Sequence, residues 1–439
     1  MKANRRLFIL ALFAFSILSL ALQPARAHGE DPHIVVLTVD GPIIPAMKDY
    51  LERGMEHAVR NSATLIVIEM NTPGGDLGST ISIVELIRAS VIPVVVYVTP
   101  NGAIAGSAGA IITMAAHASA MAPETAIGAS TPISGTGENL DSDARAKGIN
   151  ATQALIRPFV ERRGEEALAL ANAMIAEAKA VTAQEALDAG LIDFIAINVE
   201  ELLSLLDGFT LETSVGPMEL ILIGPEIDPV EMTSIERLLF ILTDPNIAFL
   251  LIAIGIQAVL IEISSPGGWV AGFIGVICLT LATYGLGVLP VNWFGIIFII
   301  TAFVLFILDI KAPTHGALTT AGVASFIVGA LVLFNSPGTP DFQRVSVPLV
   351  IVVGVTIGLL FFIILVYALR ALRVPVSMGA ETFAGKIGTV KSWDEASGQV
   401  QLESELWSAE SVSESEKISK GDKVEVVEVS GIRLKVKKK

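Results

Sequence analysis

The stretch PVVVYVTPNGAIAGSAGAIITMA, residues 93–115, decides the fold of the N-terminal half of this 439-residue chain. It begins with a run of β-branched and aromatic residues, 93–98, which predicts a buried strand. A glycine-containing turn leads to the small-residue cluster Gly106-Ser107-Ala108-Gly109 and then to an apolar run that predicts a helix ending near His117. Strand, turn and helix in this order are typical of a layered α/β domain.

The sequence on both sides of this stretch continues the alternation of strands and helices. Further strands are predicted at 34–39 and 64–70, and helices at 44–60, 79–89, 151–163, 165–179 and 182–193. In the last of these helices Thr182 and Glu185 occupy capping-box positions, and Gly190 provides a stop. Residues 28–206 are therefore expected to form one α/β domain.

The N-terminus has the sequence pattern of a secretory signal peptide. Lys2, Arg5 and Arg6 precede the apolar run 7–22, and the small-residue pattern Ala25-Arg26-Ala27 follows it. We expect residues 1–27 to be a signal peptide and the mature chain to begin near His28. An uncleaved N-terminal anchor is the alternative, because the apolar run is close to the length at which the two overlap. In either case the α/β domain is exported.

Apolar residues concentrate between residues 247 and 370 and predict about five transmembrane helices. The blocks are 247–263, 269–288, 293–308, 318–334 and 347–367, each close to the length that spans the hydrocarbon layer. With an exported first domain and five crossings, the C-terminus ends in the cytoplasm. Lys311, Arg370 and Arg373 then fall on the inner side, as the positive-inside rule requires. We expect a multi-pass protein of the cell membrane, in contact with lipid.

Two stretches complete the domain plan. Residues 207–246 are mixed in character, contain Gly and Pro, and are assigned to a linker. Residues 375–439 return to soluble composition, with short alternating runs broken by glycines. This pattern predicts a small five-stranded β-barrel on the cytoplasmic side.

The composition excludes several classes of function. Hydrophobic residues make up 52% of the chain and charged residues 17%, which rules out a wholly soluble enzyme. The net charge of −15 argues against a nucleic-acid partner, because phosphate binding needs clustered Lys and Arg. The single cysteine, Cys278, allows neither an intrachain disulfide nor a Cys zinc cluster. We expect no metal and no cofactor.

Two glycine turns in the exported domain are the candidates for chemistry. Gly74-Gly75 follows the strand 64–70, and Ser107 stands at the start of a predicted helix among small residues. Glycine permits close backbone approach, and a helix N-terminus offers free N–H donors. This arrangement predicts a hydroxyl nucleophile, Ser107, with an oxyanion hole made from the N–H groups of Gly75 and Ala108. The same pattern also occurs as a helix-packing device whose serine is a cap, so the spacing leaves both interpretations open.

A serine nucleophile needs a proton acceptor, and the histidines are poorly placed for this role. His28 and His33 lie near the mature terminus, and His57 lies on a surface helix. His117 is nearly three helical turns from Ser107, and His315 lies in a membrane loop. The remaining candidate is Lys147, which closes the polar loop 134–145 ahead of the helix expected near Asn150. A lysine base must be uncharged, so activity should rise with pH. The alternative for Lys147 is an ordinary solvated loop lysine.

Three runs together resemble a known family. NTPGG (71–75), the stretch 93–115 and AMAPETAIGASTPIS (120–134) are similar to the NfeD family of membrane-bound, ClpP-class serine proteases. The resemblance covers almost the whole chain. It implies a ClpP/crotonase-like α/β protease domain, an α-helical transmembrane bundle and an OB-like C-terminal barrel.

The resemblance also implies roles for individual residues. Ser107 matches the nucleophile of the family, and Lys147 matches the lysine of its Ser-Lys dyad. The Gly-Gly turn carries the oxyanion-hole role onto Gly75, with Ala108 as the second donor. Where ClpP has its catalytic histidine this chain reads Ile127-Gly128-Ala129, in keeping with a dyad.

The resemblance further implies a homodimer or higher oligomer that acts with stomatin-like membrane proteins, whose apolar segments are the expected substrate. The predicted function is a membrane-bound serine endopeptidase. One alternative is a crotonase-type enzyme acting on acyl-CoA, which an exported domain has little chance to meet. The other is a non-proteolytic membrane scaffold that works with stomatin-like proteins.

Overall fold

A computed structural model describes residues 32–132, 141–264, 268–312, 314, 316–337, 339–373, 383–413 and 416–439. The chain divides into two compact units, Met1–Leu305 with Thr320–Ile357, and Phe306–Thr319 with Gly358–Lys439. The expected signal peptide, His28, His315 and most of the loop 134–145 lie outside the described residues.

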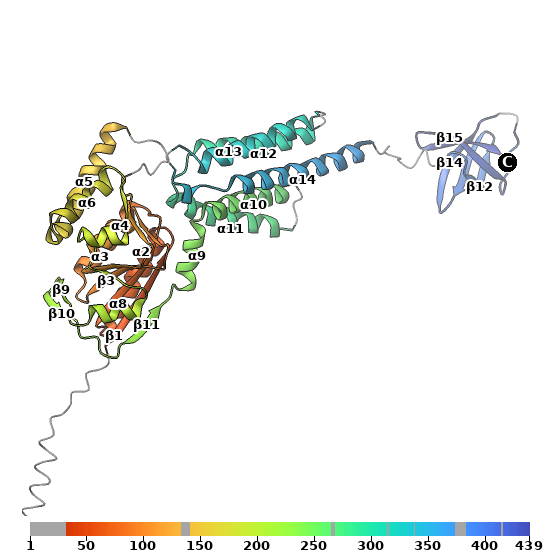
Figure 1. The fold of residues 1–439 in the computed structure, drawn as a ribbon. Helices are drawn as coiled ribbons and strands as arrows, with labels where there is room; N and C mark the ends of the chain where they lie inside the picture. Colours follow the sequence, from red (N-terminus) through yellow and green to blue (C-terminus); the bar gives the residue numbers. More distant parts are fainter. Residues whose placement is uncertain are drawn as a thin grey trace, which may run out of the picture. The chain divides into compact units, whose positions relative to one another are not determined.

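A parallel six-stranded sheet forms the centre of the first unit, in the order β11-β1-β2-β3-β5-β8 (Figure 1). Its strands are β1 (His33–Asp40), β2 (Leu65–Asn71), β3 (Val94–Val98), β5 (Ala118–Met121), β8 (Phe194–Ile195) and β11 (Glu226–Val230). The strands are near-continuous apolar runs because both faces of the sheet are covered. Val35 and Leu37 face one core cluster, and Ile34 and Val36 face the other, as the alternation of a strand requires.

Helices cover both faces of this sheet. On the face of Val35 lie α2 (Pro45–Arg60), α3 (Leu77–Ala89), α4 (Ala108–Ala115), α5 (Ser142–Val160), α6 (Glu165–Ala176) and α7 (Ala183–Asp188), and on the other face lies α8 (Val199–Leu206). The expectation that a helix starts near Asn150 is wrong. Asp141 caps α5 by accepting the N–H of Ala144 (2.7 Å), so this helix begins at Ser142 and includes Lys147.

A second, three-stranded sheet lies beside the end of β2. It consists of β4 (Ile104–Gly106), β6 (Ala126–Gly128) and β7 (Ala180–Thr182). β4 pairs in parallel with β6, and β6 pairs antiparallel with β7. This small sheet holds the turn that carries Ser107.

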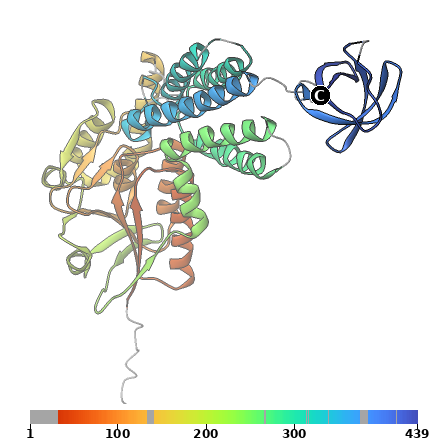
Figure 2. The same ribbon diagram turned by 90° about the vertical axis from the view of Figure 1, so that its right-hand side faces the viewer.

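Residues 207–246, for which the sequence predicts a linker, contain four further elements. β9 (Thr210–Thr213) and β10 (Gly216–Glu219) form a hairpin, β11 is an edge strand of the main sheet, and α9 (Ser234–Leu242) follows. Figure 2 shows α9, in green, beside α2, in red. This stretch therefore belongs to the folded first unit.

Five helices are long and apolar enough to cross a membrane, among the residues that the structure describes. They are α10 (Pro245–Ser264), α11 (Val270–Val288), α12 (Phe294–Lys311), α13 (Ala317–Phe334) and α14 (Val347–Arg373), and the short helix η2 (Asp341–Gln343) precedes the last. Within the first unit, Phe326 packs against Phe249 and Phe303, with ring centroids 5.7 and 6.0 Å apart. The expected membrane-spanning helices are confirmed.

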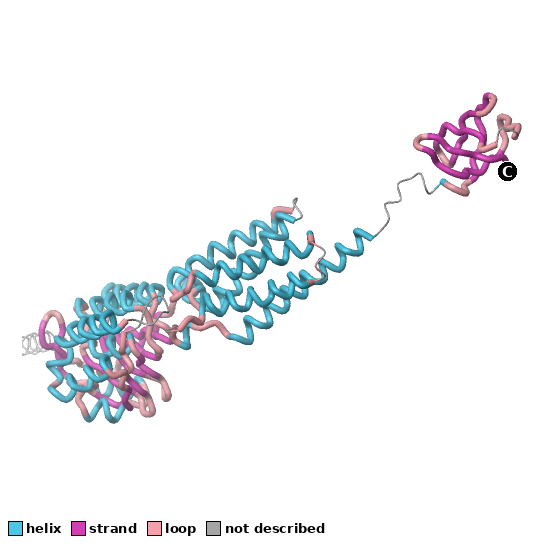
Figure 3. Tube along the Cα trace, turned by 90° about the horizontal axis from the view of Figure 1, so that it is seen from above, coloured by secondary structure: helices cyan, strands magenta, loops and turns pink. Residues whose placement is uncertain are grey.

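The C-terminal strands form a closed barrel in the order β12-β13-β14-β16-β15, drawn in magenta in Figure 3. The strands are β12 (Ile387–Asp394), β13 (Ser397–Leu402), β14 (Glu405–Ser411), β15 (Lys423–Ser430) and β16 (Arg433–Lys438). Alternate residues fill the interior, among them the buried Val390, Val400, Val424 and Leu434. The expected small five-stranded barrel is confirmed.

Candidate active site

The site is built from two backbone turns that are bonded to each other. Thr72, directly after β2, donates its N–H to the carbonyl oxygen of Ile104 (2.7 Å) and accepts the N–H of Gly106 (2.9 Å) on its own carbonyl. The turn 72–75 is thereby joined to β4 like a further short strand. The segment after Gly106 must then pass directly by Gly74 and Gly75.

The approach of these turns is closer than a side chain would permit. A Cβ atom on Gly74 would lie 2.8 Å from the Cβ of Ser107, and the φ of Gly74 is +124°, which is also unfavourable for an L-residue. A Cβ atom on Gly75 would overlap the carbonyl oxygen of Ile43. These two glycines are therefore required by the packing.

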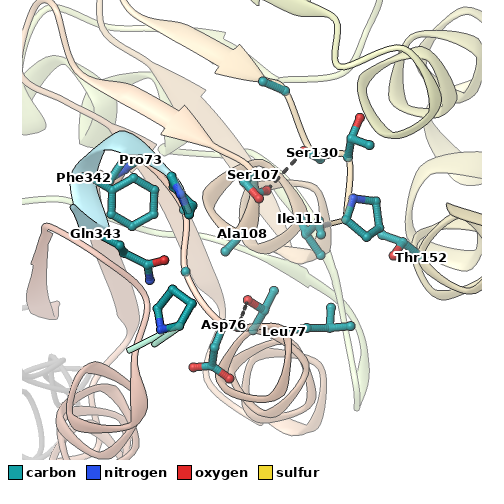
Figure 4. A pocket seen from close by; sticks show the side chains of 18 of the residues that line it. Pro73, Asp76, Leu77, Ser107, Ala108, Ile111, Ser130, Thr152, Phe342 and Gln343 are labelled. Atoms are coloured by element: carbon teal, nitrogen blue, oxygen red, sulfur yellow. Dashed lines mark hydrogen bonds between the residues drawn. The ribbon is translucent and has the colours of Figure 1, made fainter. Parts of the chain in front are cut away.

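Ser107 has a strained backbone, with φ of 49° and ψ of −108°. Two hydrogen bonds hold it, from the Ser107 N–H to the Gly128 carbonyl (2.8 Å) and from the Ser130 hydroxyl to the Ser107 carbonyl (3.1 Å; Figure 4). Ser107 occupies the N-cap position of α4, but its side chain makes no capping hydrogen bond, so its hydroxyl is not used to cap the helix. Strained residues with an available hydroxyl are typical of nucleophile positions.

Two residues that line the cavity with Ser107 have N–H groups without a hydrogen-bond partner among the described residues. Ala108 is the first residue of α4, and the N–H groups of a first turn have no partner within the helix. Among the hydrogen bonds of the described residues, none uses the N–H of Ala108 or of Gly75, whereas the N–H of Gly74 donates to the Thr72 hydroxyl (3.1 Å). The geometry thus leaves two donors available near the Ser107 hydroxyl.

These groups line a cavity of about 440 Å³ (Figure 4). Most of its wall is apolar. The wall comes from the turns at Gly74 and Ser107, from α3 and α4, from the segment after β6, from α5 and from the ends of membrane helices: Pro73, Gly74, Gly75, Asp76, Leu77, Thr80, Ser107, Ala108, Ile111, Ala129, Ser130, Thr131, Pro132, Thr152, Val288, Pro290, Pro340, Phe342 and Gln343. A mostly apolar cleft with a few polar groups is typical of a ligand-binding site.

Lys147 is not among the residues that line this cavity. Its side chain is exposed on α5, and within the described part of the chain no hydrogen-bond partner is recorded for it. The next residue, Gly148, lies against the cavity residue Pro132, since a Cβ atom there would be 3.2 Å from the Pro132 Cβ. The structure therefore brings together Ser107, Gly75 and Ala108, and it leaves Lys147 just outside the cavity wall.

The described histidines have other roles. The Nδ1 atom of His117 accepts the N–H of Val94 (3.0 Å), and its ring is buried. Burial, together with the cations Arg88 and Arg162, lowers the pKa of His117 to about 4. The other two histidines, His33 and His57, lie 3.3 and 2.7 Å from the Asp228 carboxylate on β11. None of these three is available to Ser107.

Sequence reasoning missed several residues of the cavity. Ser130 follows β6 and holds the Ser107 carbonyl, and Thr152 faces the cavity one helical turn after Gly148. Asp76 caps α3 through the N–H of Ser79 (2.8 Å) directly after Gly75, a cap that the sequence position could have indicated. Phe342 and Gln343 come from far along the chain and carry no local signal.

Three family profiles match the chain in succession. Residues 33–212 match the NfeD1b N-terminal domain, residues 246–367 the NfeD integral membrane domain, and residues 380–438 the NfeD-like C-terminal, partner-binding domain. Together they account for most of the chain.

Individual relatives agree with these matches. The chain is 34% identical to the membrane-bound protease PH1510 of Pyrococcus horikoshii, over 91% of this chain and 92% of the relative. It is 26% identical to the membrane protein NfeD1b of Bacillus subtilis, over 98% of both chains. A solved structure of the 1510-N membrane-bound stomatin-specific protease, a lysine-to-alanine variant in complex with a substrate peptide, is 30% identical, with a TM-score of 0.44 over 48% of this chain and 96% of that one. On the profile matches and the identity to PH1510, this chain belongs to the NfeD family of membrane proteins.

Proposed function

We propose that this chain is a membrane-bound serine endopeptidase with Ser107 as its nucleophile. The observation that carries the proposal is the strained Ser107, whose side chain makes no capping hydrogen bond. It lines one cavity with Gly75 and Ala108, whose N–H groups have no hydrogen-bond partner among the described residues. The adjoining apolar cavity has room for a peptide side chain. The relationship to a membrane-bound protease supports the same reaction.

The proposed reaction proceeds through an acyl-enzyme. The uncharged amine of Lys147 accepts the hydroxyl proton as Ser107 Oγ bonds to the peptide carbonyl carbon. The N–H groups of Gly75 and Ala108 stabilise the oxyanion. The C–N bond then breaks, the leaving amine takes the proton from Lys147, and water hydrolyses the ester by the same route.

This dyad requires Lys147 to turn toward the cavity. Its neighbour Gly148 lies against the cavity residue Pro132, which places the Lys147 segment of α5 beside the cavity wall. Catalytic hydrogen bonds are often long or absent before substrate binds. We therefore propose that the pair forms in the substrate complex.

The proposed substrate is an apolar segment of a stomatin-like membrane protein. The apolar cavity wall and the stomatin specificity of the 1510-N relative support this choice. We further propose that the chain works as a homodimer or higher oligomer, with the protease domain outside the cytoplasm and the barrel inside it. Modification by a membrane-impermeant reagent at a cysteine introduced into each domain would test that orientation.

The test of the dyad uses the full chain in lipid nanodiscs and an apolar peptide. Ser107→Ala should abolish cleavage and labelling by a fluorophosphonate, and Lys147→Ala should lower cleavage by about 10²-fold or more. Lys48→Ala, which removes an amine of α2 that does not line the cavity, and Ser204→Ala, which removes a hydroxyl from α8, are the matched controls. Equal cleavage by wild type and Ser107→Ala would contradict the proposal.

A membrane scaffold is the second candidate function. It is favoured by the C-terminal barrel, whose family is described as partner-binding. In that case the wild-type chain would bind a stomatin-like protein through the barrel while neither cleaving the peptide nor reacting with the fluorophosphonate.

A further inference from the structure

The cavity at Ser107 has walls from two distant parts of the chain. One wall belongs to the catalytic turns and to α5. The other, which we call the membrane-region wall, consists of Val288, Pro290, Pro340, Phe342 and Gln343. Figure 4 shows Phe342 and Gln343 on the same side of the cavity as Pro73, facing the segment that carries Ser107.

Hydrogen bonds between helix ends hold the membrane-region wall. Ser346, at the start of α14, donates its N–H to the Asn246 side chain on α10 (2.8 Å). Asn335, after α13, exchanges two hydrogen bonds with the backbone of Val345 (2.9 and 3.0 Å). The N–H of Asn292 donates to the Leu333 carbonyl (3.0 Å). The residues that bracket η2 are therefore fixed to the neighbouring helices.

The helix ends are in turn fixed to the catalytic domain through α9. Arg53 of α2 makes a two-pronged ion pair with Glu236 of α9, with nitrogen–oxygen distances of 2.7 and 2.8 Å. The ring of Phe240 packs on Gly41, so closely that a Cβ atom there would be 2.8 Å from the ring. α9 leads directly into α10, and Gly285 of α11 contacts the Leu242 carbonyl. The membrane-region wall is thus part of the same folded unit as Ser107.

The chemistry of this wall suits an apolar side chain. Its members are two prolines, a valine, an aromatic ring and one amide. Phe342 is 37% exposed, so an apolar group bound in the cavity would remove part of its ring from water. The Gln343 amide can donate to or accept from a peptide backbone.

The position of the wall relates the cavity to the bilayer. Val288 is the last residue of the apolar span Val270–Val288, and Phe342 lies at the start of the span Asp341–Tyr367. Residues at the ends of spans lie at the membrane–water interface. A substrate that contacts them must present its scissile segment at that level.

We propose that Phe342 and Gln343 are specificity-determining residues of the protease, which select an apolar juxtamembrane segment of a membrane-anchored substrate. The inference rests on the proposed function. It assigns part of the peptide-binding site to the membrane region, so that substrate choice depends on the whole first unit.

The test compares two peptides with the full chain in nanodiscs. Both carry a transmembrane anchor and differ only in one residue near the scissile bond, leucine or alanine. In Phe342→Ala the ratio of kcat/KM for the leucine peptide to that for the alanine peptide should fall by about tenfold, as expected for lost contact in an apolar pocket. Phe342→Leu should keep most of the preference. Phe273→Ala, at an exposed phenylalanine of α11, is the matched control and should keep the ratio.

The outcomes separate the inference from the proposed function. An unchanged ratio in Phe342→Ala, with an active wild type, would overturn the inference and leave the protease proposal standing. A ratio that falls as far in Phe342→Leu as in Phe342→Ala would also overturn it. A wild-type chain that neither cleaves nor reacts with a fluorophosphonate would overturn the proposed function, and the inference with it.

Discussion

The backbone of Ser107, with φ of 49° and ψ of −108°, costs free energy of the order of 1–3 kcal/mol. Hydrogen bonds to Gly128 and from Ser130 offset this cost. A serine that capped α4 would instead have an extended backbone and accept a hydrogen bond from the helix. The proposed function accounts for the strained conformation, because it requires Ser107 to present its hydroxyl to the cavity.

Gly74→Ala should disable this arrangement. The new Cβ would lie 2.8 Å from the Ser107 Cβ at a φ of +124°, so the turn must move or Ser107 must be displaced. We expect a stability loss of about 2 kcal/mol and a fall in fluorophosphonate labelling of at least about tenfold, which corresponds to a modest loss of transition-state stabilisation. Thermal unfolding and labelling rates measure the two effects.

Gly102→Ala is the control for backbone strain alone. Its φ is +84°, yet a Cβ atom there would meet nothing within 4 Å. It should lose about 1 kcal/mol of stability and keep its labelling rate. If both variants were labelled as fast as wild type, the close contact between Gly74 and Ser107 would have no catalytic importance.

The buried His117 should make the catalytic domain sensitive to acid. Its pKa is lowered to about 4, below the unfolded value near 6.5, so between these pH values the unfolded chain binds more protons. Its contribution to stability is complete above pH 6.5 and falls by about 3 kcal/mol as pH decreases to 4. Hydrogen exchange of β3 amides, corrected for intrinsic rates, measures this loss.

His117→Asn is the comparison variant, because an asparagine oxygen can accept the Val94 N–H without titrating. The variant should be less stable at pH 7 and should show a flatter decline toward pH 4. Parallel pH profiles for the two chains would contradict the assignment of acid sensitivity to His117.

At the scale of elements, Asp76 connects the N-terminus of α3 with the turn of Gly75. Asp76→Ala removes the cap on the Ser79 N–H and should cost about 1 kcal/mol of stability. Because Gly75 directly precedes the cap, its N–H should lose its fixed direction, and labelling of Ser107 should slow several-fold. Asn198→Ala removes the equivalent cap of α8, away from the cavity. It should cost similar stability and leave labelling unchanged, and an equal effect on labelling would refute the link through Gly75.

Element length explains which parts of this fold the sequence could predict. The strands expected at 34–39, 64–70 and 93–98 correspond to β1, β2 and β3, because strands buried on both faces read as long apolar runs. The three-residue strands β4, β6 and β7 are too short to show any periodicity, although they hold Ser107. The start of α5 was missed because the cap at Asp141 lies in a polar stretch that resembles a loop.

The residues of the candidate site also divide into those that the sequence could indicate and those that it could not. Ser107, Ala108 and Gly75 could be named as candidates because each lies in a short glycine-rich turn that follows a predicted strand. Lys147 could be named because the histidines are poorly placed to serve Ser107, and family resemblance points to the same residue, but whether it reaches Ser107 stays a prediction. Phe342 and Gln343 could not be found, since tertiary packing alone brings the end of the membrane region to the cavity.

At the scale of the whole molecule, β11 and α9 connect the α/β domain that contains Ser107 to the first membrane helix. β11 is held on the main sheet by its pairing with β1 and by the contacts of His33 and His57 with Asp228. The Tyr50 hydroxyl donates to the Val230 carbonyl at the end of β11 (2.7 Å). A stretch expected as a linker is therefore what sets the distance between Ser107 and the first membrane helix.

The ion pair of Arg53 and Glu236 gives the most direct test of that connection. The hydrogen bond from Arg53 lowers the pKa of Glu236, so the pair contributes at neutral pH and is lost only as pH falls below the usual glutamate range. Glu236 is largely buried and the contact is two-pronged, so a double-mutant cycle to alanine should give a coupling of about 1–2 kcal/mol.

The exposed pair of Arg60 and Glu56 on the same helix α2, 3.3 Å apart, should give a coupling of only about 0.3 kcal/mol. If α9 positions the membrane-region wall, Arg53→Ala should also lower the preference for the leucine peptide over the alanine peptide, although Arg53 lines no part of the cavity. Arg60→Ala should leave that preference unchanged. A large coupling between Arg53 and Glu236 with an unaltered peptide preference in Arg53→Ala would mean that the pair stabilises α9 without setting the position of Phe342. The membrane-region wall would then depend on the contacts between helix ends alone.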